Sequence, residues 1–367
     1  MRFAVRVPSI PSVARALVGW LLLAVILHVI FCNEVQLELL RNGGPEWASL
    51  GKWEQRRLAW THGPLALWAT FRLLDGVSLA TAFLLCGLLV ALGAWRWRQV
   101  LREQGLFMGG RDVVRISLIA QFFNAFLLGT AGGDVIKAWY AARSCPSQEG
   151  EAAVTVFVDR LLGMMGLLVV AAVLLLDHLH LLREFQRFQA VGLTLVAMLM
   201  AALGLLIAGF YTRLLEEGGR VSRLVRRIPH GASALRALAT CRQFGRRPWF
   251  LVRMLALSAA IAIIVALTYV VLARGLGMPV DASFIALVSL SAVCIAALPV
   301  TPSGLGVREN LFVWLFSIPG LSLKPGLALS LSLIAYTVNL VWSAIGGLVY
   351  LLAADRNRIQ DLATKSR

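Results

Sequence analysis

The sequence predicts an all-α integral membrane protein with about six full membrane spans and two re-entrant helical hairpins that enter from opposite faces. Two observations predict this class: the composition and the length of the apolar blocks. Of the 367 residues, 59% are hydrophobic and 15% are charged, whereas a soluble domain has about 25% charged residues. A chain with a mean hydropathy of +0.78 has too much apolar surface to bury in a soluble core. We therefore exclude a soluble enzyme and interpret residues 1–367 as a single polytopic membrane domain.

The full spans are the apolar blocks long enough to cross a bilayer. A hydrocarbon core of about 30 Å needs about 20 helical residues. Blocks that approach or exceed this length, apolar around their whole circumference, are residues 16–31, 77–95, 152–176, 190–210, 250–273 and 327–354. The first block follows arginines, as a signal peptide does, but no small-residue cleavage site follows it promptly. We interpret it as an uncleaved span.

The positive charges in the loops predict the orientation, because cytoplasmic loops have an excess of Lys and Arg. The clearest case is the basic loop 211–249, where arginine is frequent and the acidic residues are Glu216 and Glu217. Arginines also precede the first block and occupy residues 96–115 after the second. We therefore expect a multi-pass protein of the cell inner (plasma) membrane, with both termini and these two loops in the cytoplasm.

Two further apolar stretches, 113–143 and 283–318, are interrupted by helix-breaking residues. The breaks contain Gly132 and Gly133 in the first stretch, and Pro299, Pro302, Gly304 and Gly306 in the second. The span count places both ends of each stretch on one side of the membrane, so each must enter and return. Non-helical backbone at membrane depth is tolerated where it is buried in protein or lines a cavity. Two such hairpins resemble the inverted-repeat pattern of transporters, whose broken helices meet at a central site.

Charged residues lie beside these breaks and in the span that follows the first one. Burying an unpaired charge in a bilayer is costly, and such residues usually serve a site. They are Asp134, Lys137, Asp159, Arg160, Arg308 and Glu309. Under one interpretation they neutralise one another, with adjacent Asp159 and Arg160 as an embedded pair, and hold the hairpins. Under the other, Lys137, Arg160 and Arg308 form a cage for an anionic headgroup. Backbone amides at the helix starts after Gly133 and Gly306 would assist that cage. Both interpretations stay open, and they are compatible.

Three ordered motifs carry a resemblance to a known family. They are Gly132-Gly133-Asp134 with a cation at Lys137, then Asp159-Arg160-Leu161, then Pro-x-Thr-Pro-x-Gly-x-Gly-x-Arg-Glu from Pro299 to Glu309. Together they resemble the transmembrane domain of lysylphosphatidylglycerol synthases and their stand-alone, flippase-like relatives. The resemblance implies that the six charged residues line a lipid headgroup path. The family usually has Pro at Leu128 and Arg at Lys137, and a Lys binds phosphate without the bidentate fork of Arg.

The predicted function is a lipid flippase or lipid transporter that moves an anionic phospholipid or a polyprenyl-phosphate-linked amphiphile between leaflets. The alternative is a membrane glycosyltransferase or an accessory subunit of a cell-envelope glycolipid pathway. The family's synthases have an aminoacyl-transfer domain after the membrane part, but residues 355–367 are too few for one. The sequence has no Asp-x-Asp metal motif and no Gly-rich phosphate loop with Lys-Ser/Thr. We therefore predict no catalytic residue, metal or cofactor.

The predicted partners are membrane lipids. A cell-envelope biosynthetic enzyme and an oligomer of the chain are left open as further partners. The net charge of +16 is distributed over several loops, so we do not expect nucleic-acid binding.

Overall fold

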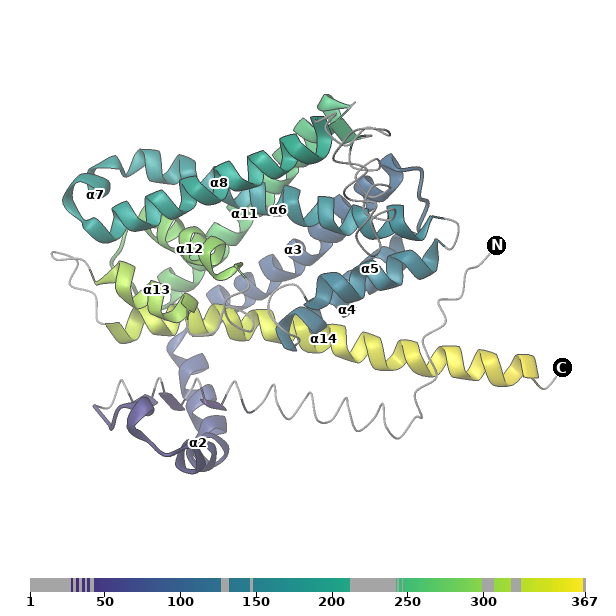
Figure 1. Cartoon of the computed structure of the whole chain (residues 1–367). Helices are drawn as coiled ribbons and strands as arrows, with labels where there is room; N and C mark the ends of the chain where they lie inside the picture. Colours follow the sequence, from purple (N-terminus) through teal and green to yellow (C-terminus); the bar gives the residue numbers. More distant parts are fainter. Residues whose placement is uncertain are drawn as a thin grey trace.

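The computed structural model describes residues 43–126, 132–145, 148–211, 247–298, 307–317 and 325–365, together with isolated positions between 28 and 39 and between 242 and 245. The described chain is helical throughout and contains no strand (Figure 1), which confirms the all-α class. The helices are η1 (Trp47–Ser49), α2 (Lys52–Leu73), α3 (Gly76–Glu103), α4 (Gly110–Phe126), α5 (Gly132–Ser144), α6 (Glu149–Asp177), α7 (Leu179–Glu184), α8 (Gln186–Tyr211), α11 (Pro248–Gly275), α12 (Ala282–Ala296), α13 (Val307–Phe316) and α14 (Pro325–Lys365).

Five of the described helices are long and apolar enough to cross a membrane, namely α3, α6, α8, α11 and α14. They coincide with five of the predicted spans, so the chain is a multi-pass membrane protein. The remaining predicted span, 16–31, lies almost entirely outside the described residues, as does most of the basic loop 211–249.

Local sequence signals explain where α3, α11 and α12 begin. The carboxylate of Asp75 accepts backbone N–H bonds from Val77 and Ser78 at the start of α3. Asp281 caps α12 in the same way, and Pro248 occupies the first turn of α11. Side-chain acceptors at the N-cap and proline in the first turn satisfy or remove the amide donors that a helix start leaves unpaired.

Each of the two interrupted stretches forms a pair of short helices. The first stretch forms α4 and α5, which pack against each other, and the second forms α12 and α13, which do the same. The breaks between them, 127–131 and 299–306, lie outside the described residues, and with them Pro299, Pro302, Gly304 and Gly306. The predicted helix pairs are therefore present, while the faces of the membrane from which they enter stay a prediction.

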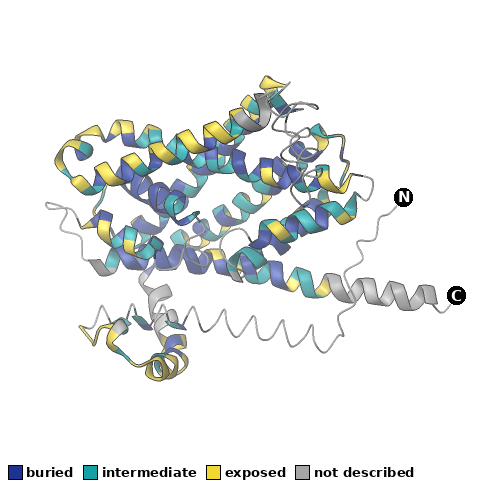
Figure 2. Cartoon of the chain, in the orientation of Figure 1, coloured by how far each residue is buried: buried dark blue, intermediate teal, exposed yellow. Residues whose placement is uncertain are grey.

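The helices enclose a buried centre (Figure 2), and α14 runs along one side of the bundle against α3, α4 and α13 (Figure 1). Glycines allow the closest approaches between helices. A Cβ atom on Gly346 of α14 would lie 2.0 Å from the Leu118 carbonyl oxygen of α4, and one on Gly166 of α6 would lie 2.5 Å from the backbone of Ser258 on α11. Small residues at helix contacts are the usual means of close packing in membranes.

Candidate functional site

A cavity of about 450 Å³ lies between the spans and both helix pairs. This volume falls within the range of about 300–1,000 Å³ typical of small-molecule pockets. Its charged lining consists of Arg96, Asp134, Asp159, Arg160 and Arg308. The rest of the wall combines the amides Gln121, Asn124 and Asn339 with Tyr336, Ser258 and apolar residues from α3, α4, α6, α11 and α12, among them Leu89, Gly93, Leu167, Ile261 and Val293.

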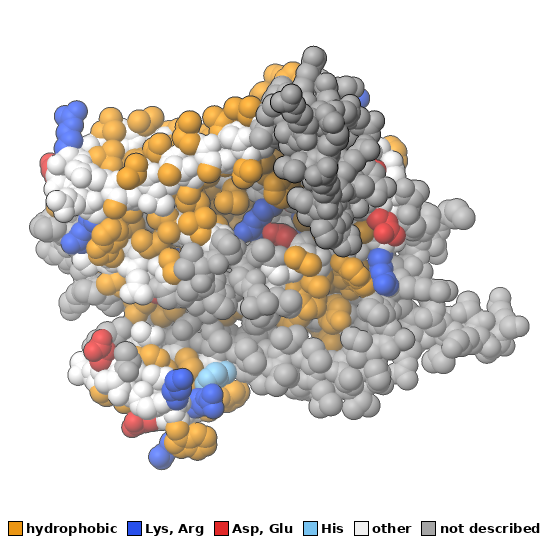
Figure 3. Space-filling model, viewed as in Figure 1, with side chains coloured by type: hydrophobic (Ala, Val, Ile, Leu, Met, Phe, Trp, Pro, Cys, Tyr) orange, Lys and Arg blue, Asp and Glu red, His pale blue; other side chains and the backbone are white. Residues whose placement is uncertain are grey.

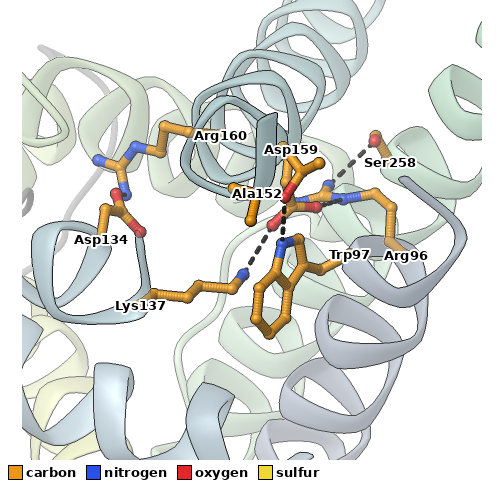
Figure 4. A network of polar contacts seen from close by, with 9 residues as sticks. Arg96, Trp97, Asp134, Lys137, Ala152, Asp159, Arg160 and Ser258 are labelled. Atoms are coloured by element: carbon orange, nitrogen blue, oxygen red, sulfur yellow. Dashed lines mark hydrogen bonds and ion pairs between the residues drawn. The ribbon is translucent and has the colours of Figure 1, made fainter. Parts of the chain in front are cut away.

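Asp159 of α6 bridges two cations beside this cavity (Figure 4). Its Oδ1 accepts a hydrogen bond from Arg96 Nε of α3 at 2.8 Å, and its Oδ2 accepts one from Lys137 Nζ of α5 at 2.9 Å. Arg96 also donates from Nη1 to Ser258 Oγ of α11 at 3.0 Å. All three charged side chains are buried. The Asp159 carboxylate thus joins α3, α5 and α6, and Arg96 extends the network to α11.

Lys137 contacts Trp97 of α3 as well as Asp159. The Lys137 ammonium lies 4.3 Å from the centre of the indole ring, in cation–π geometry. The indole Nε1 donates to Thr155 Oγ1 of α6 at 3.2 Å. Of the six predicted headgroup residues, Lys137 therefore contacts Asp159 and Trp97, and it does not line the cavity.

Asp134 and Arg160 form a second ion pair between α5 and α6, with 3.3 Å between Asp134 Oδ2 and Arg160 Nη1. The interpretation of adjacent Asp159 and Arg160 as one embedded pair is therefore wrong. Consecutive side chains of an α-helix point about 100° apart, so each finds its partner on α5. Asp134 pairs with Arg160, and Lys137 pairs with Asp159.

Arg308 and Glu309 form a third pair at the start of α13. Arg308 Nη2 lies 2.6 Å from Glu309 Oε1, and Arg308 Nε donates to Ser332 Oγ of α14 at 3.0 Å. The guanidinium also lies 4.8 Å from the centre of the Tyr336 ring. Here the two charges that are adjacent in sequence do pair with each other.

The backbone amides at the start of α5 are predicted to assist an anion cage, but one of them is already bonded within the protein. The Gly133 amide donates to Asn124 Oδ1 of α4 at 2.8 Å, so it has a protein partner. A Cβ on Gly133 would lie 1.9 Å from the Ala120 carbonyl oxygen, which explains why glycine occupies this position. Gly132, the other predicted break residue in this stretch, is buried in the first turn of α5. Gly306, before α13, lies outside the described residues.

Sequence reasoning missed Arg96, which it counted among the cytoplasmic loop charges. In the structure α3 continues to Glu103, and Arg96 is buried within it. A Cβ on Gly163 would lie 2.8 Å from Arg96 Nη2, so α6 leaves room for the guanidinium. The available signal was an arginine directly between two tryptophans, Trp95 and Trp97, at the end of an apolar block.

Within the described residues, no group of three or more His, Cys, Asp and Glu side chains is arranged to hold a metal ion. The polar groups that line the cavity in the described part of the chain are charged side chains, amides and hydroxyls. Such groups bind and orient a charged ligand.

Comparison with known proteins identifies a family for the chain. No curated protein and no solved structure shows significant similarity to the chain. The family described as the lysylphosphatidylglycerol synthase TM region matches residues 57–347, a range that includes all the ion pairs described above. The chain therefore belongs to the lysylphosphatidylglycerol synthase transmembrane-region family, as the three motifs indicated.

Proposed function

We propose that this protein takes a lipid headgroup into the central cavity and moves the lipid between leaflets. The observation that carries the proposal is the cavity itself, in which three arginines and two aspartates face a mainly apolar wall between membrane-spanning helices. Charged residues at membrane depth usually mark a substrate path. The family supports a membrane role connected with lipids.

The charge balance favours an anionic headgroup. Around the cavity, Arg96, Lys137, Arg160 and Arg308 accompany the carboxylates Asp134, Asp159 and Glu309. Among the described residues, one cation is therefore in excess. Arginine binds phosphate, as it binds carboxylate, in a bidentate manner, and phosphate is the anion of most lipid headgroups, so we propose an anionic phospholipid or a polyprenyl-phosphate-linked amphiphile as the substrate.

The cavity volume limits what enters it. At about 30 Å³ per water molecule, the cavity of about 450 Å³ holds the equivalent of about 15 waters. This is the size of a headgroup with its hydration. We propose that the acyl or prenyl chains stay outside, in the hydrocarbon of the membrane.

The test is leaflet exchange of labelled lipids in proteoliposomes, with phosphatidylglycerol and a polyprenyl phosphate compared in parallel. Gly93 lines the cavity, and a Cβ there meets no atom within 4 Å. Gly93→Leu should therefore fill cavity space without a backbone clash, and leucine favours the helix by about 1 kcal/mol over glycine. We expect this variant to fold and to exchange lipid near the protein-free rate.

Gly204→Leu is the matched control. Gly204 lies on α8, away from the cavity, and a Cβ there also meets nothing within 4 Å. We expect it to exchange lipid at the parental rate. Parental protein that exchanges neither lipid faster than empty vesicles would contradict the proposed function.

A further inference from the structure

The Asp134–Arg160 pair differs from the other ion pairs around the cavity. Its shortest N–O distance is 3.3 Å, against 2.6–2.9 Å in the other pairs at the site. Its side chains are 24% and 33% exposed, against 8–12% in those pairs. Both residues nevertheless line the cavity. This pair is therefore both accessible and in contact with the interior of the site.

The pair joins the first turn of α5 to α6. Asp134 is in the first turn of α5, and α6 continues past Arg160 with Met164 and Leu167, which line the cavity. The surrounding surface is apolar, because Val135 next to Asp134 is 67% exposed and Phe157, one turn before Arg160, is 55% exposed. Figure 3 shows a basic and an acidic side chain next to each other among hydrophobic side chains on one face of the molecule.

We propose that Asp134 and Arg160 gate a lateral mouth between α5 and α6, through which a phosphate-bearing lipid headgroup passes from the membrane into the cavity. Arg160 exchanges the Asp134 carboxylate for the phosphate as the headgroup enters. This inference rests on the proposed function, since it assigns to one ion pair of that cavity the admission of its substrate.

Energetics favour this pair over the others as the one that opens. A longer, partly exposed ion pair is easier to separate than a short, enclosed one, because removing one partner of a buried pair leaves an uncompensated charge in a low-dielectric setting. Breaking the Asp159 or Glu309 pairs would separate opposite charges whose side chains are almost fully enclosed. Lys137, whose ammonium is bound to Asp159, still lies one turn along α5 from Asp134 when Arg160 leaves it.

The mechanism predicts opposite effects for the two halves of the pair. Asp134→Asn removes the competitor of the phosphate, so binding should tighten by about tenfold. Arg160→Gln removes the phosphate ligand, so binding should weaken by about tenfold, the size of one hydrogen bond to a charged group. The measurement is the affinity of the purified full chain in detergent for short-chain phosphatidylglycerol, by titration calorimetry.

Two further ligands identify the source of the phosphate. Inorganic phosphate should bind at least tenfold more weakly than short-chain phosphatidylglycerol, and short-chain diacylglycerol, which lacks phosphate, should bind more weakly as well. Equal affinity for inorganic phosphate and the lipid would contradict a lipid mouth.

The matched control is the buried pair, through Lys137→Gln and Asp159→Asn. If an ion pair serves only to stabilise the fold, removing either partner should change the measured quantity in the same direction. We expect both control variants to lower folded yield. Opposite shifts in affinity for Asp134→Asn and Arg160→Gln support the mouth, and equal or same-sign shifts overturn it. If either neutral variant is recovered unfolded, Arg160→Lys replaces it, because this change keeps the charge but loses the bidentate fork. Weaker lipid binding by Arg160→Lys supports the mouth, and unchanged binding overturns it.

The experiments distinguish failure of the lateral mouth from failure of the proposed lipid exchange. If parental protein exchanges lipid, Gly93→Leu abolishes the exchange, and Asp134→Asn and Arg160→Gln behave like the parent, the mouth is wrong and the cavity function stands. If parental protein neither binds nor exchanges lipid, both are wrong.

Discussion

The two helix pairs both carry charged residues beside their breaks, but they neutralise those charges in different ways. In the first pair, Asp134 and Lys137 of α5 form ion pairs with the neighbouring span α6. In the second pair, Arg308 of α13 is neutralised by its own neighbour Glu309, and it reaches α14 through a hydrogen bond to Ser332. Ion pairs therefore connect the first helix pair to a neighbouring span. In the second helix pair, the cation and its counter-ion lie on the same helix. A charge change in the first should disturb the contact between helices, and one in the second should act locally.

The largest effect predicted from this comparison is that of Asp159→Asn. This change leaves Arg96 and Lys137 buried without their common counter-ion, and breaking a buried pair costs about 3–5 kcal/mol. Glu309→Gln should cost less, because it isolates one cation that keeps Ser332 and the Tyr336 ring. The measurement is thermal unfolding in detergent, followed by tryptophan fluorescence. Equal destabilisation by the two changes would remove the distinction between the helix pairs.

A smaller effect is expected at the contact of α4 with α5. Gly133→Ala places a methyl group 1.9 Å from the Ala120 carbonyl oxygen, so the two helices must move apart, at a cost of about 1–3 kcal/mol for overpacking. Gly150→Ala is the matched control, because a Cβ on Gly150 in the first turn of α6 meets nothing within 4 Å. It should be neutral or slightly stabilising. Gly133→Ala with parental stability would show that this helix pair does not depend on close contact.

The smallest effect concerns the helix starts, which also differ between the two pairs. The amide of Asn124 caps α5 and does not titrate, whereas the carboxylate of Asp281 caps α12. Hydrogen bonds from the hydroxyl and amide of Ser283 hold the pKa of Asp281 below its usual value. A lowered folded-state pKa stabilises the fold above the unfolded value of about 3.9 and loses this contribution as the pH falls through the folded pKa.

The corresponding test is the difference in unfolding temperature between parent and Asp281→Asn from pH 7 to pH 3. This difference should be constant above about pH 5 and should become less favourable to the parent below about pH 4. A difference that grows in favour of the parent as the pH falls would contradict the lowered pKa.

The sequence predicted the spans better than it predicted the site. Apolar length alone located α3, α6, α8, α11 and α14, because the width of a bilayer imposes it. The cost of burying charge drew attention to four residues that line the cavity, namely Asp134, Asp159, Arg160 and Arg308; their role toward a headgroup stays a prediction. Which charges pair could not be predicted, because it depends on the way α5 packs on α6.

Arg96 shows the other limit of sequence reasoning. An arginine at the end of an apolar block has the same pattern whether it faces cytoplasm or lies within the bundle. The burial of Arg96 depends on Asp159, which is 63 residues further along the chain. A contact at this separation leaves no local periodicity in the sequence.

The position of α14 has a consequence for the folding of the whole bundle. Along this helix, Ser332 binds Arg308 of the second helix pair, Asn339 accepts a hydrogen bond from Gln121 of the first at 2.7 Å, and Gly346 packs on Leu118. These contacts extend over about 21 Å of one α-helix, at 1.5 Å per residue. Separating the first pair from α14 would break the hydrogen bond between Gln121 and Asn339, and separating the second would break the one between Arg308 and Ser332. Either separation leaves polar groups without these partners. The two pairs therefore belong to one cooperative folding unit, although the first ends at Ser144 and the second begins at Ala282.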